Sequence, residues 1–226
     1  MKITPVGQYG QQLTRFGVIN CYLVREDDGY TLIDSNLKGS DADILEAAGD
    51  VPIRRILLTH PHVDHVGSVD ALMTKIADIK LLSSERSIPI LQIPPDLSLR
   101  PGEVGPIRGG TPGIRSKVTE TVAEGDRVGS LLAIDTPGHI HGHQSFLDER
   151  DGALYVGDEF GSLGQLSVTG FTPWWFPLKA FSNRDQARDT ARKLLAYPIR
   201  RMACGHGKVL EGGRELLRGA IDRAES

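Results

Sequence analysis

Three histidines and one aspartate are crowded into six consecutive positions of this chain, in the stretch THPHVDHVG. The four residues are His60, His62, Asp64 and His65. Residues 53–60 are rich in apolar residues and predict a strand, whereas residues 66–78 carry apolar residues at helical spacing and predict a helix. The cluster therefore lies where a strand ends and a helix begins. Because ligands gather at the carboxyl ends of strands in α/β folds, this arrangement favours that fold class.

The rest of the chain continues the alternation of strands and helices. Further strands are predicted at 17–24, 30–35, 118–123, 131–136, 144–148, 153–157 and 200–204, and further helices at 40–50, 183–196 and 212–223. The first two strands are joined through Asp27, Asp28 and Gly29, which is a hairpin signal. Residues 92–113 are rich in proline and glycine, so they form either a surface connection or a loop over a binding cleft. We expect one α/β domain over residues 1–226.

Charge and composition disfavour several classes of partner. The net charge is −3 and the 26 lysine and arginine residues are spread along the chain, so we expect no nucleic acid partner. No apolar run reaches the roughly 18 residues of a membrane span and no apolar signal region is present, so we expect a cytoplasmic protein without membrane attachment. Cys21 and Cys204 are isolated, which agrees with a reducing compartment, and Cys204 is expected in the core. A small-molecule substrate is the expected partner.

The histidine cluster has too many ligands for a single catalytic metal ion. Neutral imidazole and carboxylate bind zinc and similar divalent metals, and a catalytic zinc ion usually takes three protein ligands and one water. Alternate side chains on extended backbone share a face, so His60 and His62 can hold one ion, whereas Asp64 and His65 lie beyond the turn and can serve a second. Further candidates that each follow a predicted strand are His139, Asp158 and His206. The sequence therefore predicts a two-metal site at one edge of a sheet.

These motifs and their order resemble the metallo-β-lactamase superfamily over essentially the whole chain: Asp34, then THPHVDHVG, TPGHIHGH, GD and GHG. The resemblance implies an α/β fold, a four-layer αβ/βα sandwich, with a dinuclear site between the edges of two sheets. It also implies one metal ion on His60, His62 and His139, a second on Asp64, His65 and His206, and Asp158 as a bridge between them. The two divalent ions are expected to be zinc, with iron or manganese as alternatives. Asp34 and His143 are expected to orient the ligands rather than to bind metal.

The chemistry of such a site implies a hydrolase. Two nearby cations lower the pKa of a shared water toward about 7 and stabilise the oxyanion that develops during attack. Asp64 is the expected catalytic proton carrier. The chain has no G-x-S-x-G elbow, and its GHGKV stretch does not match a phosphate-binding loop. We therefore expect a metal-bridging hydroxide to cleave a small carbonyl ester, lactone or thioester.

Two other functions known in this family stay open, an iron-dependent sulfur dioxygenase-type oxidoreductase and a β-lactamase. The diiron oxidoreductases typically carry glutamate where this chain has His62, which disfavours the redox alternative. The missing signal region disfavours a β-lactamase. The family's lactonases share the TPGH and GHQS motifs, but Phe160 and Gly161 stand where their tyrosine is expected.

An aromatic stretch lies between the predicted ligands Asp158 and His206. The stretch GFTPWWFPLKAF holds the only two tryptophans of the chain, Trp174 and Trp175. It forms either ordinary core or, together with Phe160 and Phe171, an apolar wall for the acyl part of a substrate.

The stretch TPGHIHGH contains three histidines, of which His139 matches the ligand position of the family. If the chain runs extended from this residue into the next strand, His141 and His143 lie successively farther from the metal, by about 6 to 7 Å per two residues. We therefore expect only His139 to bind metal directly.

Overall fold

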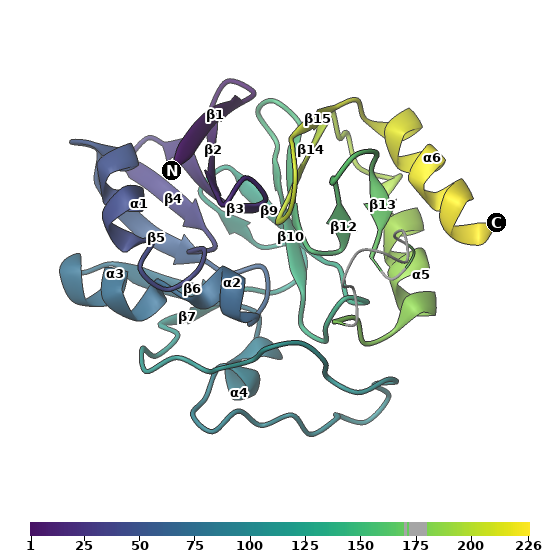
Figure 1. The fold of residues 1–226 in the computed structure, drawn as a ribbon, viewed down its shortest axis with the longest axis horizontal. Coiled ribbons are helices and arrows are strands. Elements are labelled where there is room, and N and C mark those ends of the chain that lie inside the picture. Colours follow the sequence, from purple (N-terminus) through teal and green to yellow (C-terminus); the bar gives the residue numbers. More distant parts are fainter. Residues whose placement is uncertain (170, 172–179) are drawn as a thin grey trace.

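The computed structural model describes residues 1–169, 171 and 180–226, and in this part of the chain two large sheets face each other (Figure 1). The first sheet contains, in spatial order, β1 (Lys2–Val6), β2 (Gly10–Arg15), β3 (Ile19–Glu26), β4 (Gly29–Ile33), β5 (Ile53–Leu57), β6 (Lys80–Ser83) and β7 (Glu120–Thr121). The second contains β15 (Leu210–Glu211), β14 (Arg201–Cys204), β11 (Ala153–Gly157), β10 (Gln144–Asp148), β9 (Leu131–Asp135) and β8 (Arg127–Val128). The short strands β12 (Phe160–Gly161) and β13 (Ser167–Val168) pair separately.

Helices cover the outer face of each sheet (Figure 1). They are α1 (Asp41–Ala48) and α3 (Val69–Lys75) on the first sheet and α5 (Arg184–Leu194) and α6 (Arg214–Glu225) on the second. Two further short helices, α2 (Val63–Val66) and α4 (Ser87–Ile90), lie near the lower end of the sheets in Figure 1. Buried residues of α1 and α3 pack on the first sheet, and those of α5 and α6 pack on the second. The predicted αβ/βα sandwich is therefore confirmed, with two mixed sheets flanked by helices.

The period-two alternation of the strands explains the layers. In β3, Cys21 and Leu23 pack toward α1 and α3, whereas Tyr22 and Val24 pack between the two sheets. Because both faces of the strand are buried here, its four central residues, 21–24, are all apolar rather than alternating with polar residues. The same rule places Cys204 of β14 in the core beneath α5 and α6, where it is fully buried, as predicted.

The structure differs from the predicted elements near the N-terminus and after the histidine cluster. The strands β1 and β2 were not predicted, because Pro5 and the polar residues of 8–12 hide the alternation; β1 lies at a sheet edge, where proline is tolerated. The helix predicted at 66–78 is in fact two, α2 and α3, and begins at Val63. The chain leaves helical geometry between them at Ser68, and at Gly67 a Cβ atom would lie 2.3 Å from the backbone nitrogen of Lys38.

Three smaller differences concern the middle of the chain. The strand predicted at 118–123 is reduced to the two residues of β7, and the strand β6 and the short helix α4 were not predicted. These elements are too short to show a clear hydrophobic period, which is why the sequence pattern misses them.

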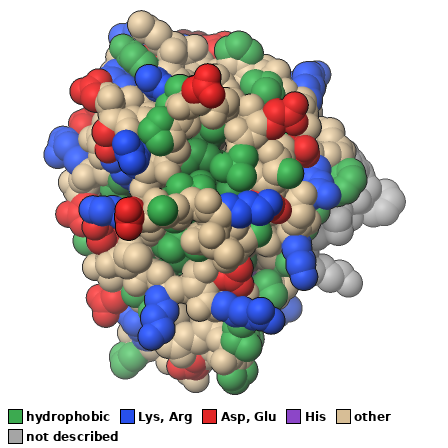
Figure 2. Space-filling model, turned by 90° about the vertical axis from the view of Figure 1, so that its left-hand side faces the viewer, with side chains coloured by type: hydrophobic (Ala, Val, Ile, Leu, Met, Phe, Trp, Pro, Cys, Tyr) green, Lys and Arg blue, Asp and Glu red, His purple; other side chains and the backbone are tan. Residues whose placement is uncertain are grey.

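The face of the molecule that carries α1 and α3 has a mixed surface. Acidic and basic side chains are interspersed there around a hollow lined by hydrophobic side chains (Figure 2). Among the described residues, no helix is long and apolar enough to cross a membrane.

Candidate metal centre

The predicted metal ligands meet where strands of both sheets end. Their ligand atoms form three overlapping groups, and within each group all atoms lie within 4.8 Å of one another. The groups are His60, His62 and His139; His60, His65 and Asp158; and Asp64, His65 and His206. Residues from opposite halves of the chain thus converge on one place, which is consistent with a dinuclear metal site.

The first group is formed by His60, His62 and His139, all nearly or fully buried. Nδ1 of His62 lies 2.9 Å from Nε2 of His139, and the two rings are nearly perpendicular. Oδ2 of Asp158 lies 3.7 Å from Nε2 of His139 and 4.0 Å from Nε2 of His60. Three imidazole nitrogens and one carboxylate oxygen therefore surround a single small space.

The second group is formed by Asp64, His65 and His206. Nε2 of His206 lies 3.2 Å from Oδ2 of Asp64 and 3.1 Å from Oδ2 of Asp158. Oδ1 of Asp158 lies 3.4 Å from Nε2 of His65. Asp158 thus contacts both groups, which is the arrangement that a carboxylate bridging two ions requires.

Unpaired buried atoms show that the residues fit a pair of divalent cations. In the part of the chain that the structure describes, Nε2 of His60, Nε2 of His65 and Oδ1 of Asp158 are buried without a hydrogen-bond partner. Buried polar atoms are nearly always paired, so three such atoms at one site call for a ligand. Imidazole and carboxylate suit zinc, iron and manganese alike, so the donor set does not select the metal.

Burial keeps two of the histidines in the form that binds metal. Complete burial lowers the pKa of His60, and the neighbouring His65 and His62 lower it further. Burial also lowers the pKa of His139, again helped by His62. Both imidazoles are therefore neutral near pH 7, as a metal ligand must be.

In the second group, attraction between carboxylates and imidazoles outweighs the effect of burial on the pKa values. Burial opposes the charge on His206, but Asp158 and Asp64 outweigh it and raise the pKa of His206 to about 10. Burial likewise opposes ionisation of Asp64, but His65 and His206 lower the pKa of this carboxyl to about 2. In the metal-free protein His206 is thus protonated, and an ion that binds there displaces this proton.

Asp34 lies behind His65 and holds it in place. This aspartate is buried, and its Oδ2 accepts hydrogen bonds of 2.7 Å from Nδ1 of His65 and of 2.7 Å from the hydroxyl of Thr59. Its Oδ1 accepts the backbone N–H of Thr59 at 2.8 Å. Because Nδ1 of His65 donates to Asp34, Nε2 is left to face the ion, the orienting role predicted for this residue.

His143 lies closer to the site than an extended chain would place it, so that part of the prediction is wrong. Residues 137–143 form a turn, with Gly142 at φ +82° and the N–H of His143 donating to the carbonyl of Ile140. The ring of His143 returns to 5.0 Å from that of His60, its Nδ1 pairs with Thr136, and its Nε2 accepts the backbone N–H of Asp158 at 3.2 Å. Burial lowers the pKa of His143 to about 3, so this acceptor is always available.

A glycine that follows β14 allows the ligands to approach the backbone. A Cβ atom at Gly205 would lie 2.1 Å from Oδ1 of Asp158 and 2.6 Å from Cε1 of His65. The GHG motif, taken from the sequence only for its histidine His206, therefore also marks this close approach.

Glu159 contacts the turn at His139, a role that was not predicted from the sequence. This residue is fully buried, its Oε2 accepts the backbone N–H of His139 at 3.1 Å, and burial raises the pKa of its carboxyl. Its position directly after Asp158 was the only available signal. Through this hydrogen bond Glu159 helps to fix the turn that places His139 in the first ligand group.

The predicted aromatic wall is only partly described. Trp174 and Trp175 lie outside the described residues. Phe160 is 1% exposed and packs in the core beneath α5 and α6, which favours a packing role over contact with a substrate. Phe171 is half-buried against the same core, and the guanidinium of Arg188 lies 4.4 Å from its ring centre.

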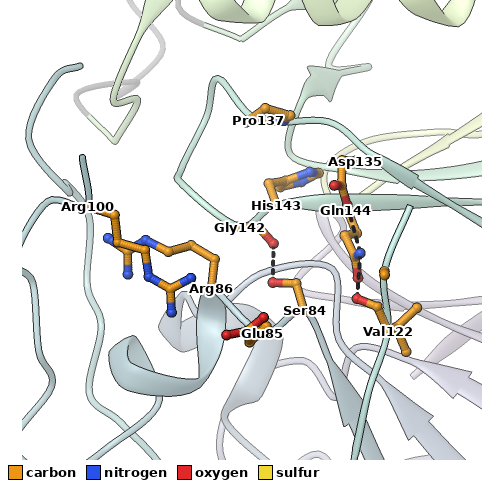
Figure 3. Close-up of a pocket in the computed structure, with 11 residues that line it drawn as sticks. Ser84, Glu85, Arg86, Arg100, Val122, Asp135, Pro137, Gly142, His143 and Gln144 are labelled. Atoms are coloured by element: carbon orange, nitrogen blue, oxygen red, sulfur yellow. Dashed lines mark hydrogen bonds between the residues drawn. The ribbon is translucent and has the colours of Figure 1, made fainter. Parts of the chain in front are cut away.

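Among the residues that the structure describes, the second group is more exposed than the first. The side chains of Asp64 and His206 are 23% and 18% exposed, whereas those of His60 and His139 are at most 1% exposed. A separate cavity of about 300 Å³ lies beside His143, between the turn at Gly142 and residues 84–86 (Figure 3). Of the described ligand residues, Asp64 and His206 are thus the ones that solvent reaches most easily.

Comparison with curated proteins agrees with this geometry. Residues 14–206 match the family described as the metallo-beta-lactamase superfamily. The chain is 43% identical over its full length to a Bacillus subtilis (strain 168) protein named "Uncharacterized protein YobT", of which it covers 99%. It is 30% identical to the hydroxyacylglutathione hydrolase of Aeromonas hydrophila, over 63% of this chain and 47% of that protein, so it spans about half of that relative. It is also 26% identical to the atrochrysone carboxyl ACP thioesterase nsrC of Aspergillus novofumigatus, over 78% of this chain and 49% of that protein.

Solved structures share the fold at low sequence identity. BJP-1, a subclass B3 metallo-beta-lactamase of Bradyrhizobium japonicum, superposes with a TM-score of 0.68 at 21% identity, over 100% of this chain and 91% of that one. TTHA1623 in a di-iron-bound form superposes with a TM-score of 0.66 at 22% identity, over 98% of both chains. With the family match across most of its length and the ligand groups in place, this chain belongs to the metallo-beta-lactamase superfamily.

Proposed function

We propose that this protein is a dinuclear metal-dependent hydrolase of a small carbonyl ester, lactone or thioester. The observation that carries the proposal is the arrangement of Asp158, whose two carboxylate oxygens lie against both ligand groups. Bound there, two divalent ions would lower the pKa of a water and stabilise an oxyanion. The candidate ligands are His60, His62 and His139 for one ion, Asp64, His65 and His206 for the other, and Asp158 for both.

The protein's own residues supply the remaining functions. Asp64 belongs to the more exposed group and stays ionised, because His65 and His206 hold its pKa low, so it can accept a proton from the attacking water. Asp34 and His143 keep His65 and the backbone of Asp158 in position. The burial of the first group keeps bulk water away from that side of the centre.

Activated acyl compounds are the substrates that the relatives favour. Two of the named relatives are a hydroxyacylglutathione hydrolase and a carboxyl ACP thioesterase. The net charge of −3 argues against a polyanionic substrate such as RNA. We therefore place lactones and acyl thioesters ahead of phosphodiesters, and zinc ahead of iron or manganese. We also propose that the protein acts in the cytoplasm without nucleic acid or membrane partners.

A parallel hydrolysis screen tests the proposal. Protein reconstituted separately with zinc, manganese and iron is assayed on lactones, acyl thioesters, β-lactams and phosphodiesters, with chelator-treated protein as the control. We expect lactone or thioester cleavage that disappears with the metal. Faster phosphodiester or β-lactam cleavage would contradict the substrate class, and oxygen uptake with glutathione persulfide in the iron form would point instead to a sulfur dioxygenase.

A further inference from the structure

Residues 98–110, which we call the covering segment, lie across the buried side of the metal centre. The carbonyl of Arg108 accepts a hydrogen bond of 2.7 Å from Nε2 of His62, and the carbonyl of Gly105 accepts one of 2.9 Å from Nε2 of His141. The backbone N–H of Val63 donates to the carbonyl of Gly110 at 2.8 Å. Of the two roles that the sequence left open for residues 92–113, these contacts favour a loop that covers the site.

The covering segment is also anchored at its beginning and in its middle. The guanidinium of Arg86 pairs with both carboxylate oxygens of Glu103, at 2.5 and 2.9 Å, and donates to the carbonyl of Ser98. Arg86 and Arg100 are both among the residues that line the cavity next to Gly142 (Figure 3). The Arg86–Glu103 ion pair and the hydrogen bond of His141 to Gly105 thus hold the segment next to the turn that carries His139 and His141.

The contact with Arg108 determines which nitrogen of His62 can bind metal. A carbonyl oxygen only accepts hydrogen bonds, so Nε2 of His62 must carry the proton. The neutral ring then has its lone pair on Nδ1, and this is the nitrogen that faces Nε2 of His139, 2.9 Å away. The tautomer that the covering segment selects is thus the one that the first ligand group needs.

Close approach of the segment to His62 depends on a glycine. Gly109 has φ +88°, and a Cβ atom at this position would lie 2.4 Å from Nε2 of His62 and 2.8 Å from its Cε1. Any other side chain here would push the Arg108 carbonyl away from the ring. Gly102 has nearly the same backbone angle, φ +87°, but its Cβ atom would meet no atom within 4 Å.

We infer that the Arg108 carbonyl and Gly109 are positioning elements of the metal centre, because together they fix the tautomer of His62. Through this contact, closure of the covering segment is coupled to binding of the ion held by the first group. The inference rests on the metal centre of the proposed function and not on its substrate. By linkage, if closure strengthens binding of the ion by some factor, the ion must strengthen closure by the same factor.

The first test compares Gly109→Ala with the matched control Gly102→Ala, because both place alanine at the same backbone angle. We expect Gly109→Ala to weaken one of the two ions by about 10 to 100-fold, the size typical of a lost partner behind a metal-binding histidine. Gly102→Ala and Gly110→Ala should bind both ions as wild type does; a Cβ atom at Gly110 would lie 3.4 Å from Val63, an ordinary contact. In a His139→Ala background, Gly109→Ala should have no further effect on the remaining ion.

The second test uses limited proteolysis and needs no activity. Arg108 is exposed, so trypsin can cut the bond between Arg108 and Gly109 whenever the segment opens. Zinc should slow this cut by about 10 to 100-fold in wild type and much less in Gly109→Ala, whereas the cut after the exposed Lys117 reports any effect of zinc on trypsin itself.

The outcomes separate the two proposals. If wild type binds two ions but Gly109→Ala matches Gly102→Ala in both affinities and in proteolysis, the inference is wrong and the metal centre stands. If wild type never binds more than one ion, the dinuclear function itself is wrong.

Discussion

Replacing Asp34 by asparagine tests how the protein selects the metal-binding nitrogen of His65. Asp34 is 2% exposed and has φ +58°, a backbone conformation that asparagine also tolerates. The substitution therefore leaves the backbone unstrained and changes only the hydrogen-bonding side chain.

The effect follows from the partners of this side chain. An amide at position 34 can keep the acceptor for the backbone N–H of Thr59, but its NH2 group then faces Nδ1 of His65, to which Asp34 is bonded at 2.7 Å. Nδ1 must become an acceptor and the ring proton moves to Nε2, the nitrogen that faces Asp158. We expect the ion held with His206 to bind about 10 to 100-fold more weakly, which is roughly 1.4 to 2.7 kcal/mol.

Competition titration with a chromophoric chelator measures both ions separately. Asp34→Asn should lose affinity for one ion and keep the other, and turnover should fall with the loss of the weakened ion. Asp148→Asn is the matched control, because Asp148 is fully buried and paired with Arg150 at the end of β10 away from His143. Wild-type affinity for both ions in Asp34→Asn, or an equal loss in Asp148→Asn, would refute the role assigned to Asp34.

Four further substitutions give three separate tests. His139→Ala should lose one ion and nearly all turnover, whereas His143→Ala should keep two ions with turnover lowered about 10 to 100-fold; metal content and kcat of both variants check this, and the reverse result would overturn the ligand assignment. Burial raises the pKa of Glu159, so the folded state disfavours the ionised form of this carboxyl. The free energy of unfolding of the wild type should therefore fall relative to that of Glu159→Gln as pH rises above about 4.3, the usual pKa of glutamate in an unfolded chain. The slope is at most about 1.4 kcal/mol per pH unit. Urea unfolding of both proteins between pH 4.5 and 7 measures that difference, and parallel curves would contradict it. Gly205→Ala would place a methyl group 2.1 Å from Oδ1 of Asp158, so elemental analysis should find fewer than two ions per chain in protein that keeps its circular dichroism spectrum; two tightly bound ions would show that the bridge tolerates displacement.

Much of the layered fold could be predicted from local sequence patterns. The apolar runs of β3, β4, β5, β10 and β11 are long enough to show their period, and they lie within or close to the predicted ranges. The strands β1 and β2 could not be predicted, because their sequences KITPV and GQQLTR show no clear alternation of apolar and polar residues, and it is pairing with β3 and with each other that places them in the sheet.

The ligand groups could also be predicted, because metal binding needs particular side chains at particular places. Imidazoles and carboxylates that follow buried strands must meet at the sheet edge, and the structure brings all seven predicted ligands together there. The orienting role of Asp34 was expected from the family resemblance rather than from its place after a strand.

The sequence by itself determined which side chains can hold metal and which strands present them, since both depend on residue type and local spacing. Only the tertiary structure decided which nitrogen of His62 is free, what covers the first ligand group, and how His143 folds back. These features depend on backbone carbonyls and N–H groups, such as those of Arg108 and Asp158, brought close by long-range packing. Every residue carries a carbonyl and nearly every residue an N–H, so their role leaves no mark in the sequence until the fold has placed them.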